Sequence, residues 1–141
     1  MNYGRLILAA VVGTIVDACY GFVVYGLLLT SEFARTPLVY RSMDTQVAYM
    51  PFLFAGIFLA MLAAAFIYAK GYEGGSGLME GARCGAALGV FAAGYAAIVG
   101  YAITNIGRKM TAELAGANLI EWVINGIVIG LVYKSAAPAK K

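Results

Sequence analysis

Two acidic residues stand in stretches of the chain that are otherwise apolar, and their type and position could support proton or cation chemistry. Asp17 lies about twelve residues into the run Leu6–Leu29, and Glu121 lies about eight residues into the run Leu114–Tyr133. In a membrane-spanning run, a charged side chain near the bilayer centre costs roughly 2.5–3.5 kcal/mol on insertion scales. Each carboxyl should therefore be protonated or hydrogen-bonded, and should face protein or water rather than lipid.

Two asparagines extend the polar face around Glu121. Asn118, Glu121 and Asn125 are spaced i, i+3 and i+7, which places them on one side of a helix. At a rise of 1.5 Å per residue, Asp17 and Glu121 come within about one turn of the same depth when their spans run in opposite directions. We predict that these four residues form one polar intramembrane cluster where the first and fourth spans meet. One of its two carboxyls should retain a proton, because two charges repel strongly in a low dielectric.

Such a cluster has two interpretations. It can be a proton relay or a cation site for transport, because intramembrane carboxyls mark such paths. The interpretation that we favour is structural, with a neutral carboxyl hydrogen-bonded to an Asn or Tyr of the next helix. Such bonds contribute only about 0.6–2 kcal/mol but determine which helices meet. The sequence contains no clear inverted repeat and no internal proline that breaks a helix, features that accompany many secondary transporters.

Four apolar runs position these residues, and they account for most of the 141 residues. The chain is 62% hydrophobic and 12% charged, whereas a soluble domain is about a quarter charged. Each run is about 20 residues or longer, which is enough to cross ~30 Å of hydrocarbon as a helix. We predict a single all-α integral membrane domain, an antiparallel up-down bundle of four transmembrane helices: residues 6–29, 47–69, 81–104 and 114–133. The longest connection, residues 30–46, should be an interfacial helix or a solvated loop.

Glycines recur at helical spacing in three of the four spans. In lipid, close backbone contact holds helices together, so rows of small residues indicate helix–helix contacts. The predicted packing positions are Gly13, Gly21, Gly81, Gly85, Gly89, Gly126 and Gly130. Because small residues continue along the third span beyond Gly89, we expect this span to be the one on which the others pack.

Several kinds of chemistry lack their usual residues. The chain has no histidine, and its two cysteines, Cys19 and Cys84, belong to no C-x-x-C pair and lie at different depths. The loop after the second span is rich in glycine but contains no phosphate-binding motif. We therefore predict no catalytic residues, no bound cofactor and no metal site. The net charge of +3 is located at the helix ends, so we expect contact with membrane lipids and not with nucleic acid.

The even number of spans places both termini on one side of the membrane. Six basic residues lie on that side: Arg5, Lys70, Arg83, Lys134, Lys140 and Lys141. Four lie on the other: Arg35, Arg41, Arg108 and Lys109. The excess predicts that both termini are cytoplasmic.

The second half of the chain resembles a group of small, uncharacterised, four-span bacterial integral membrane proteins. The resemblance consists of the K-G-Y-E-G turn at 70–74, the E-G-x-R-x-G helix start at 80–85, the Glu121–Trp122 pair before Gly126–Gly130, and the closing Tyr133–Lys134. Asp17 fits the same pattern. The resemblance implies the bacterial inner membrane but implies no activity. We expect a structural or accessory subunit, as a homo-oligomer or within a larger membrane complex, and keep a small proton- or cation-coupled transporter centred on Asp17 and Glu121 as the alternative.

Overall fold

The computed structural model describes residues 1–134, so Lys140 and Lys141 lie outside the described residues. Across that part of the chain every regular element is a helix, and four helices are long and apolar enough to span a membrane. These candidate spans are Tyr3–Leu28, Asp44–Gly71, Gly77–Ile103 and Arg108–Lys134. The predicted all-α bundle of four membrane helices is confirmed, with each span beginning three to six residues before the predicted start.

Three of the four spans are built from more than one helical element. The first is α1, Tyr3–Val23, followed by the π-helix η1, Val24–Leu28. The second is α3, Met43–Gln46, then the 3₁₀ turn η2, Val47–Tyr49, then α4, Met50–Gly71. The third is α5, Gly77–Ala92, the π-helix η3, Ala93–Val99, and α6, Gly100–Ile103. The fourth is α7, Arg108–Lys134, a single helix.

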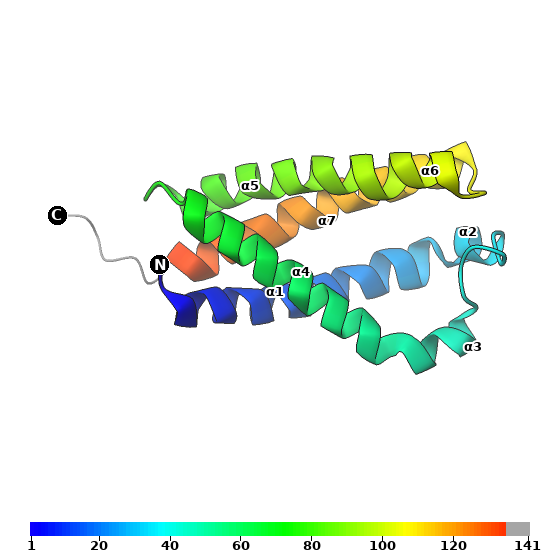
Figure 1. Ribbon diagram of the computed structural model, residues 1–141, viewed down its shortest axis with the longest axis horizontal. Helices are drawn as coiled ribbons and strands as arrows, with labels where there is room; N and C mark the ends of the chain where they lie inside the picture. Colours follow the sequence, from blue (N-terminus) through cyan, green and yellow to red (C-terminus); the bar gives the residue numbers. More distant parts are fainter. Residues whose placement is uncertain (135–141) are drawn as a thin grey trace.

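Helix α7 is the central element of the bundle (Figure 1). Helix α5 runs antiparallel along one side of α7, α1 lies along another side, and α4 crosses α1. The expectation that the glycine-rich third span would be the central helix is wrong, because α5 packs almost entirely on α7 and makes little contact with α4. A row of glycines on one face permits one very close partner, not several.

The two ends of the bundle differ in what covers them. Tyr3, Gly71, Gly77 and Lys134 lie at one end, which we call the terminal end (Figure 1). The short helix α2, Thr30–Ala34, lies at the other end together with α3, α6 and the first residues of α7, and we call this the α2 end. The predicted interfacial segment 30–46 is thus two short helices, α2 and α3, joined by turns.

The contact between α5 and α7 is a backbone contact. A Cβ atom added to Gly77 would lie 2.6 Å from the Gly130 carbonyl oxygen, and one added to Gly81 would collide with the Gly126 carbonyl oxygen. An added Cβ on Gly85 would collide with the Trp122 carbonyl oxygen. Gly89 lies against Leu119 in the same row. The five glycines predicted for packing in these two spans therefore all lie at this contact, and Gly77 joins them.

The two glycines on either side of Asp17 have different surroundings. Gly13 faces α4, where an added Cβ would lie 3.2 Å from Met61 Sδ. Gly21 has only Tyr25 of its own span within 4 Å of such an atom. The expectation that Gly21 lets a neighbouring helix approach is therefore wrong. The chain enters η1 three residues later, and the Tyr25 ring turns back over this position.

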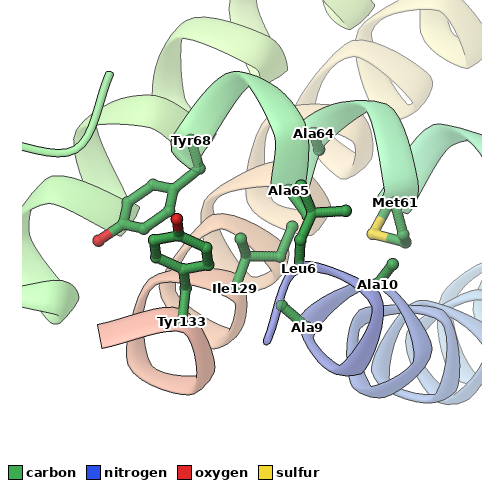
Figure 2. Close-up of a cluster of buried hydrophobic side chains, with 9 residues drawn as sticks. All are labelled: Leu6, Ala9, Ala10, Met61, Ala64, Ala65, Tyr68, Ile129 and Tyr133. Atoms are coloured by element: carbon green, nitrogen blue, oxygen red, sulfur yellow. The ribbon is translucent and has the colours of Figure 1, made fainter. Parts of the chain in front are cut away.

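An apolar core fills the terminal half of the bundle (Figure 2). It joins α1, α4 and α7 through nine buried side chains: Leu6, Ala9, Ala10, Met61, Ala64, Ala65, Tyr68, Ile129 and Tyr133. Four of these are alanines, and their small side chains let α1 and α4 cross closely. In lipid this packing acts through van der Waals contact, since lipid is as apolar as the core itself.

Polar contacts hold the connections at both ends. At the α2 end, Glu32 bonds Arg35 at 2.9 Å and Lys109 at 2.5 Å, which ties α2 to the start of α7. The hydrogen bond from Lys109 and the nearby guanidinium of Arg35 hold the pKa of Glu32 below its usual range. At the terminal end, the Glu80 carboxylate accepts from the Gly75 N–H, at 2.5 Å, and closes the loop before α5.

Candidate functional site

The described part of the chain buries three polar or charged residues, and all three lie where α1 meets α7. Asp17 on α1 is 8% exposed, and Glu121 and Asn125 on α7 are 8% and 1% exposed. These are three of the four residues predicted to form the polar intramembrane cluster. The structure brings them together because α1 and α7 run antiparallel and pack against each other (Figure 1).

Asp17 and Asn125 form the direct link between the two helices. Asn125 Nδ2 donates a hydrogen bond to Asp17 Oδ1 at 2.5 Å. The other amide atom, Asn125 Oδ1, is buried and has no hydrogen-bond partner in the structure. An unpaired buried acceptor is costly, by about 1–3 kcal/mol. The Asp17–Asn125 pair therefore makes one hydrogen bond and leaves the acceptor Asn125 Oδ1 without a donor.

Two tyrosines from the end of the first span complete the cluster. The Tyr25 hydroxyl donates to Glu121 Oε2 at 2.8 Å, and the Tyr20 hydroxyl donates to the Ala117 carbonyl at 2.9 Å. Tyr20 and Tyr25 are five residues apart and would point in different directions from a regular α-helix. The π-helix η1 adds a residue to the turn, so both rings face α7 and pack edge to face at 6.2 Å.

Asn118 does not join this network. Its Nδ2 donates at 2.7 Å to the carbonyl oxygen of Leu114, one turn earlier in α7. The expectation that Asn118 shares the pocket with Asp17 and Glu121 is therefore wrong. A short amide side chain on a helix can bond its own backbone, and here that local bond takes the place of one across the interface.

The polar groups of α7 form a row that begins at the α2 end. Glu113, Glu121 and Asn125 are spaced i, i+8 and i+12, with the backbone carbonyl of Ala117 between the first two, and lie on one face, which we call the α7 polar stripe. Glu113 Oε1 lies 3.6 Å from Lys109 Nζ, whereas Glu113 Oε2 is buried and has no hydrogen-bond partner. The next member of the row is Ile129, which belongs to the apolar core. The stripe therefore enters the bundle from one end and stops near the middle.

Sequence reasoning missed Tyr20, Tyr25 and Glu113 as members of this site. The sequence does not indicate that the two tyrosines share a face, because residues five apart lie on different faces of a regular α-helix. Only the π-helix η1 brings both rings toward α7. The sequence does indicate Glu113, since it lies eight residues before Glu121 and so falls on the same helix face.

The chemistry available to this arrangement is acid–base chemistry and oxygen coordination. Two carboxyls, a carboxamide and two phenols are present. Among the residues that the structure describes, no group of three or more His, Cys, Asp or Glu side chains is placed to hold a metal ion. Cys19 is exposed on α1 and Cys84 is half-buried on α5, and neither has a hydrogen bond to the cluster in the described residues.

No family model, curated protein or solved structure matches this chain. The resemblance to small four-span bacterial proteins therefore stays a prediction. The four long apolar helices establish the general class, a multi-pass membrane protein.

Proposed function

We propose that this protein is a non-catalytic accessory subunit of a membrane assembly, and that a helix of a neighbouring chain packs against α4. The observation that carries the proposal is the first half of α4. Phe52, Leu53 and Phe54 are 76%, 45% and 48% exposed, and this half of the helix diverges from α1 (Figure 1). The second half of α4, from Met61 onward, contributes Met61, Ala64, Ala65 and Tyr68 to the apolar core.

The divergence of α4 from α1 leaves a shallow groove of about 540 Å³ at membrane depth. Ile15, Cys19 and Phe22 line it from α1, and Phe54 lines it from α4. The hydroxyl of Thr14, which also lines the groove, donates to the Ala10 carbonyl at 2.8 Å and so is already bonded. A groove of this kind matches the apolar side chains of a transmembrane helix, which would pack there by van der Waals contact.

A site-specific cross-linking experiment tests this proposal. A photoreactive phenylalanine analogue is placed at Phe52, and a matched control carries it at Phe91, which is 69% exposed on the outer side of α5. After illumination of native membranes, we expect position 52 to give a defined protein adduct and position 91 to label lipid. Equal labelling of lipid at both positions, together with a native mass of a single chain in mild detergent, would refute the accessory role.

We further propose that the protein resides in the bacterial inner membrane with both termini in the cytoplasm. The support is the count of basic residues in the sequence, six predicted for the side of the two termini against four for the other side. A cysteine-accessibility scan in whole cells tests the orientation. A single cysteine in place of Ser76 should be protected from a membrane-impermeant maleimide, and one in place of Ser42 should react.

A second candidate function is proton- or cation-coupled transport. The specific observation that favours it is the burial of Asp17 and Glu121 beside each other in the membrane interior, since structural bonding alone does not require two carboxyls. Asp17→Asn separates the two candidates. An amide at position 17 can still bond Asn125, so assembly should persist, whereas a step in which Asp17 carries a proton should be lost.

A further inference from the structure

We propose that the α7 polar stripe is a one-sided proton path, which connects the buried Asp17–Glu121 pair to water at the α2 end and not at the terminal end. The inference deepens the second candidate function and rests on it for the two carboxyls. The exchanged species is the proton, and it enters from the α2 end. Net transport is a further property that the path alone does not require.

The charge balance of the cluster requires at least one bound proton. Asp17 is bonded by Asn125, and the groups that act on Glu121 are Asp17 and Tyr25. Neither carboxyl has a lysine or arginine beside it in the described part of the chain. Two unpaired carboxylates in one buried cluster would repel each other in a low dielectric, so the pair holds a proton between them.

The unpaired oxygen of Asn125 identifies where that proton rests. A hydrogen on Asp17 Oδ2 can donate to Asn125 Oδ1, while Asn125 Nδ2 donates to Asp17 Oδ1. This cyclic acid–amide pair satisfies the one acceptor that the structure otherwise leaves unbonded. Exchange with water takes place at Glu121: its carboxylate gains an O–H bond when water from the α2 end delivers a proton, and that bond breaks to return the proton to water when the pH rises, while Asp17 keeps its own proton.

The route from Glu121 to water follows the stripe. Asn125 and Glu121 are buried, whereas Glu113, nearer the α2 end, is half-buried. Glu113 and Glu121 are eight residues apart, or about 12 Å along the axis, so water must carry the proton between them. The Tyr20 hydroxyl and the Ala117 carbonyl lie within this interval, and Glu113 Oε2 has no bonded partner.

The opposite direction is blocked by apolar packing. Beyond Asn125 the same face of α7 continues with Ile129, which is 1% exposed and packs with Leu6, Ala10 and Met61 (Figure 2). No polar side chain of this core on α7 lies between Asn125 and Tyr133, the penultimate residue of α7. The aliphatic side chains there offer water no hydrogen-bonding partner, and the hydroxyls of the core, on Tyr68 and Tyr133, lie together near the terminal end, so a proton does not reach that end by this face.

The titratable groups that face the pair are few. Glu121 faces Asp17 from α7, and Tyr20 and Tyr25 face it from the first span. Residues 50–67 of α4, which also packs on α1, contain no ionisable side chain. Helix α5 meets α7 on its glycine face, through Gly81 and Gly85. The half-buried thiol of Cys84 on α5 and the two phenols ordinarily titrate at a pH of about 8.5 and about 10, so a signal in the acid and neutral range reports Asp17 and Glu121.

The single tryptophan of the chain is an intrinsic reporter for this test. Trp122 follows Glu121 in α7, so a change in the charge of Glu121 should change its emission. The full-length protein is reconstituted into sealed vesicles of one orientation, selected through a tag on the carboxyl terminus. The pH is stepped on one side while buffer holds the other side constant. We expect Trp122 emission to follow the pH at the α2 end and to ignore a step at the terminal end.

Three variants assign the response to residues. The double variant Asp17→Asn/Glu121→Gln should lose the response, and Glu113→Gln should slow it while keeping its amplitude. Asp44→Asn, an exposed acid at the α2 end, is the matched control and should respond like the wild type. A response to the terminal-side pH, the lack of any response in the wild type, or an unchanged response in the double variant would each overturn the proposal.

The wild-type measurement decides sidedness even when a variant fails to fold. Proton flux through the same vesicles under a pH gradient is recorded separately. A one-sided response without flux would support the path and refute transport. Flux with a response to both sides would support transport and refute the one-sided path.

Discussion

Replacing Gly85 by alanine should destabilise the bundle, and the structure sets the size of the effect. A Cβ at position 85 would lie 2.9 Å from Val123 Cα and 3.1 Å from Gly126 Cα, and closer still to the Trp122 carbonyl oxygen. All three neighbours are backbone atoms, which cannot rotate away as a side chain can. Ordinary contact begins near 3.4 Å, so α5 and α7 must separate by a substantial fraction of an ångström.

The expected cost is that of overpacking, about 1–3 kcal/mol. Alanine favours the helix over glycine by up to ~1 kcal/mol, so the net loss should be about 1–2 kcal/mol. The matched control is Gly56→Ala on α4, where an added Cβ has nothing within 4 Å and the same helix preference applies. Its stability should be equal to or above that of the wild type.

The assay is equilibrium unfolding in mixed micelles, followed by circular dichroism as the fraction of denaturing detergent is raised. Gly85→Ala should unfold at a lower fraction than both the wild type and Gly56→Ala. If Gly85→Ala is as stable as Gly56→Ala, the backbone contact between α5 and α7 does not stabilise the bundle, and the reasoning fails.

Three further predictions concern polar contacts. Asn125→Leu should cost about 1–3 kcal/mol in the same unfolding assay, because Asp17 loses its buried partner, whereas Asn118→Leu should be close to neutral. Tyr25→Phe keeps the ring but removes the donor to Glu121, and should cost about 0.5–1.5 kcal/mol, with Tyr101→Phe as the exposed control. Glu32 has a lowered pKa when folded, so its contribution to stability is present above the ordinary glutamate pKa and is lost as pH falls through the lowered value. Glu32→Gln should flatten that acid limb of a stability-against-pH curve, and a curve that keeps the wild-type slope would contradict the pairing with Lys109.

The positions of the spans and the depth of the two carboxyls could be predicted because both follow from local arithmetic. Hydrophobic runs of about 20 residues span a bilayer as helices, and a rise of 1.5 Å per residue locates Asp17 and Glu121 along them. The glycines at four-residue spacing also indicated close contact from the sequence, since only side-chain size was needed. The spacing of the glycines does not indicate that α7 is the helix that packs on the glycine face of α5.

The interior of the site was less predictable because it depends on departures from regular geometry. Tyr25 reaches Glu121 through a π-turn, and no residue pattern in Val24–Leu28 marks that turn. Asn118 lies on the expected face but bonds the carbonyl of Leu114. The first contact depends on a departure from the regular helix, and the second on a local bond within α7 that replaces one between helices.

The sequence by itself determined the number of spans, their helical form, the mid-membrane depth of Asp17 and Glu121, and the absence of histidine. These properties depend on the type and order of residues within one segment. The tertiary structure alone decided that α7 is central, that the polar stripe opens toward the α2 end, and that Ile129 and its neighbours block the terminal end. These depend on which faces of separate helices meet, and in lipid, where apolar faces are nearly equivalent, shape and a few hydrogen bonds make that choice.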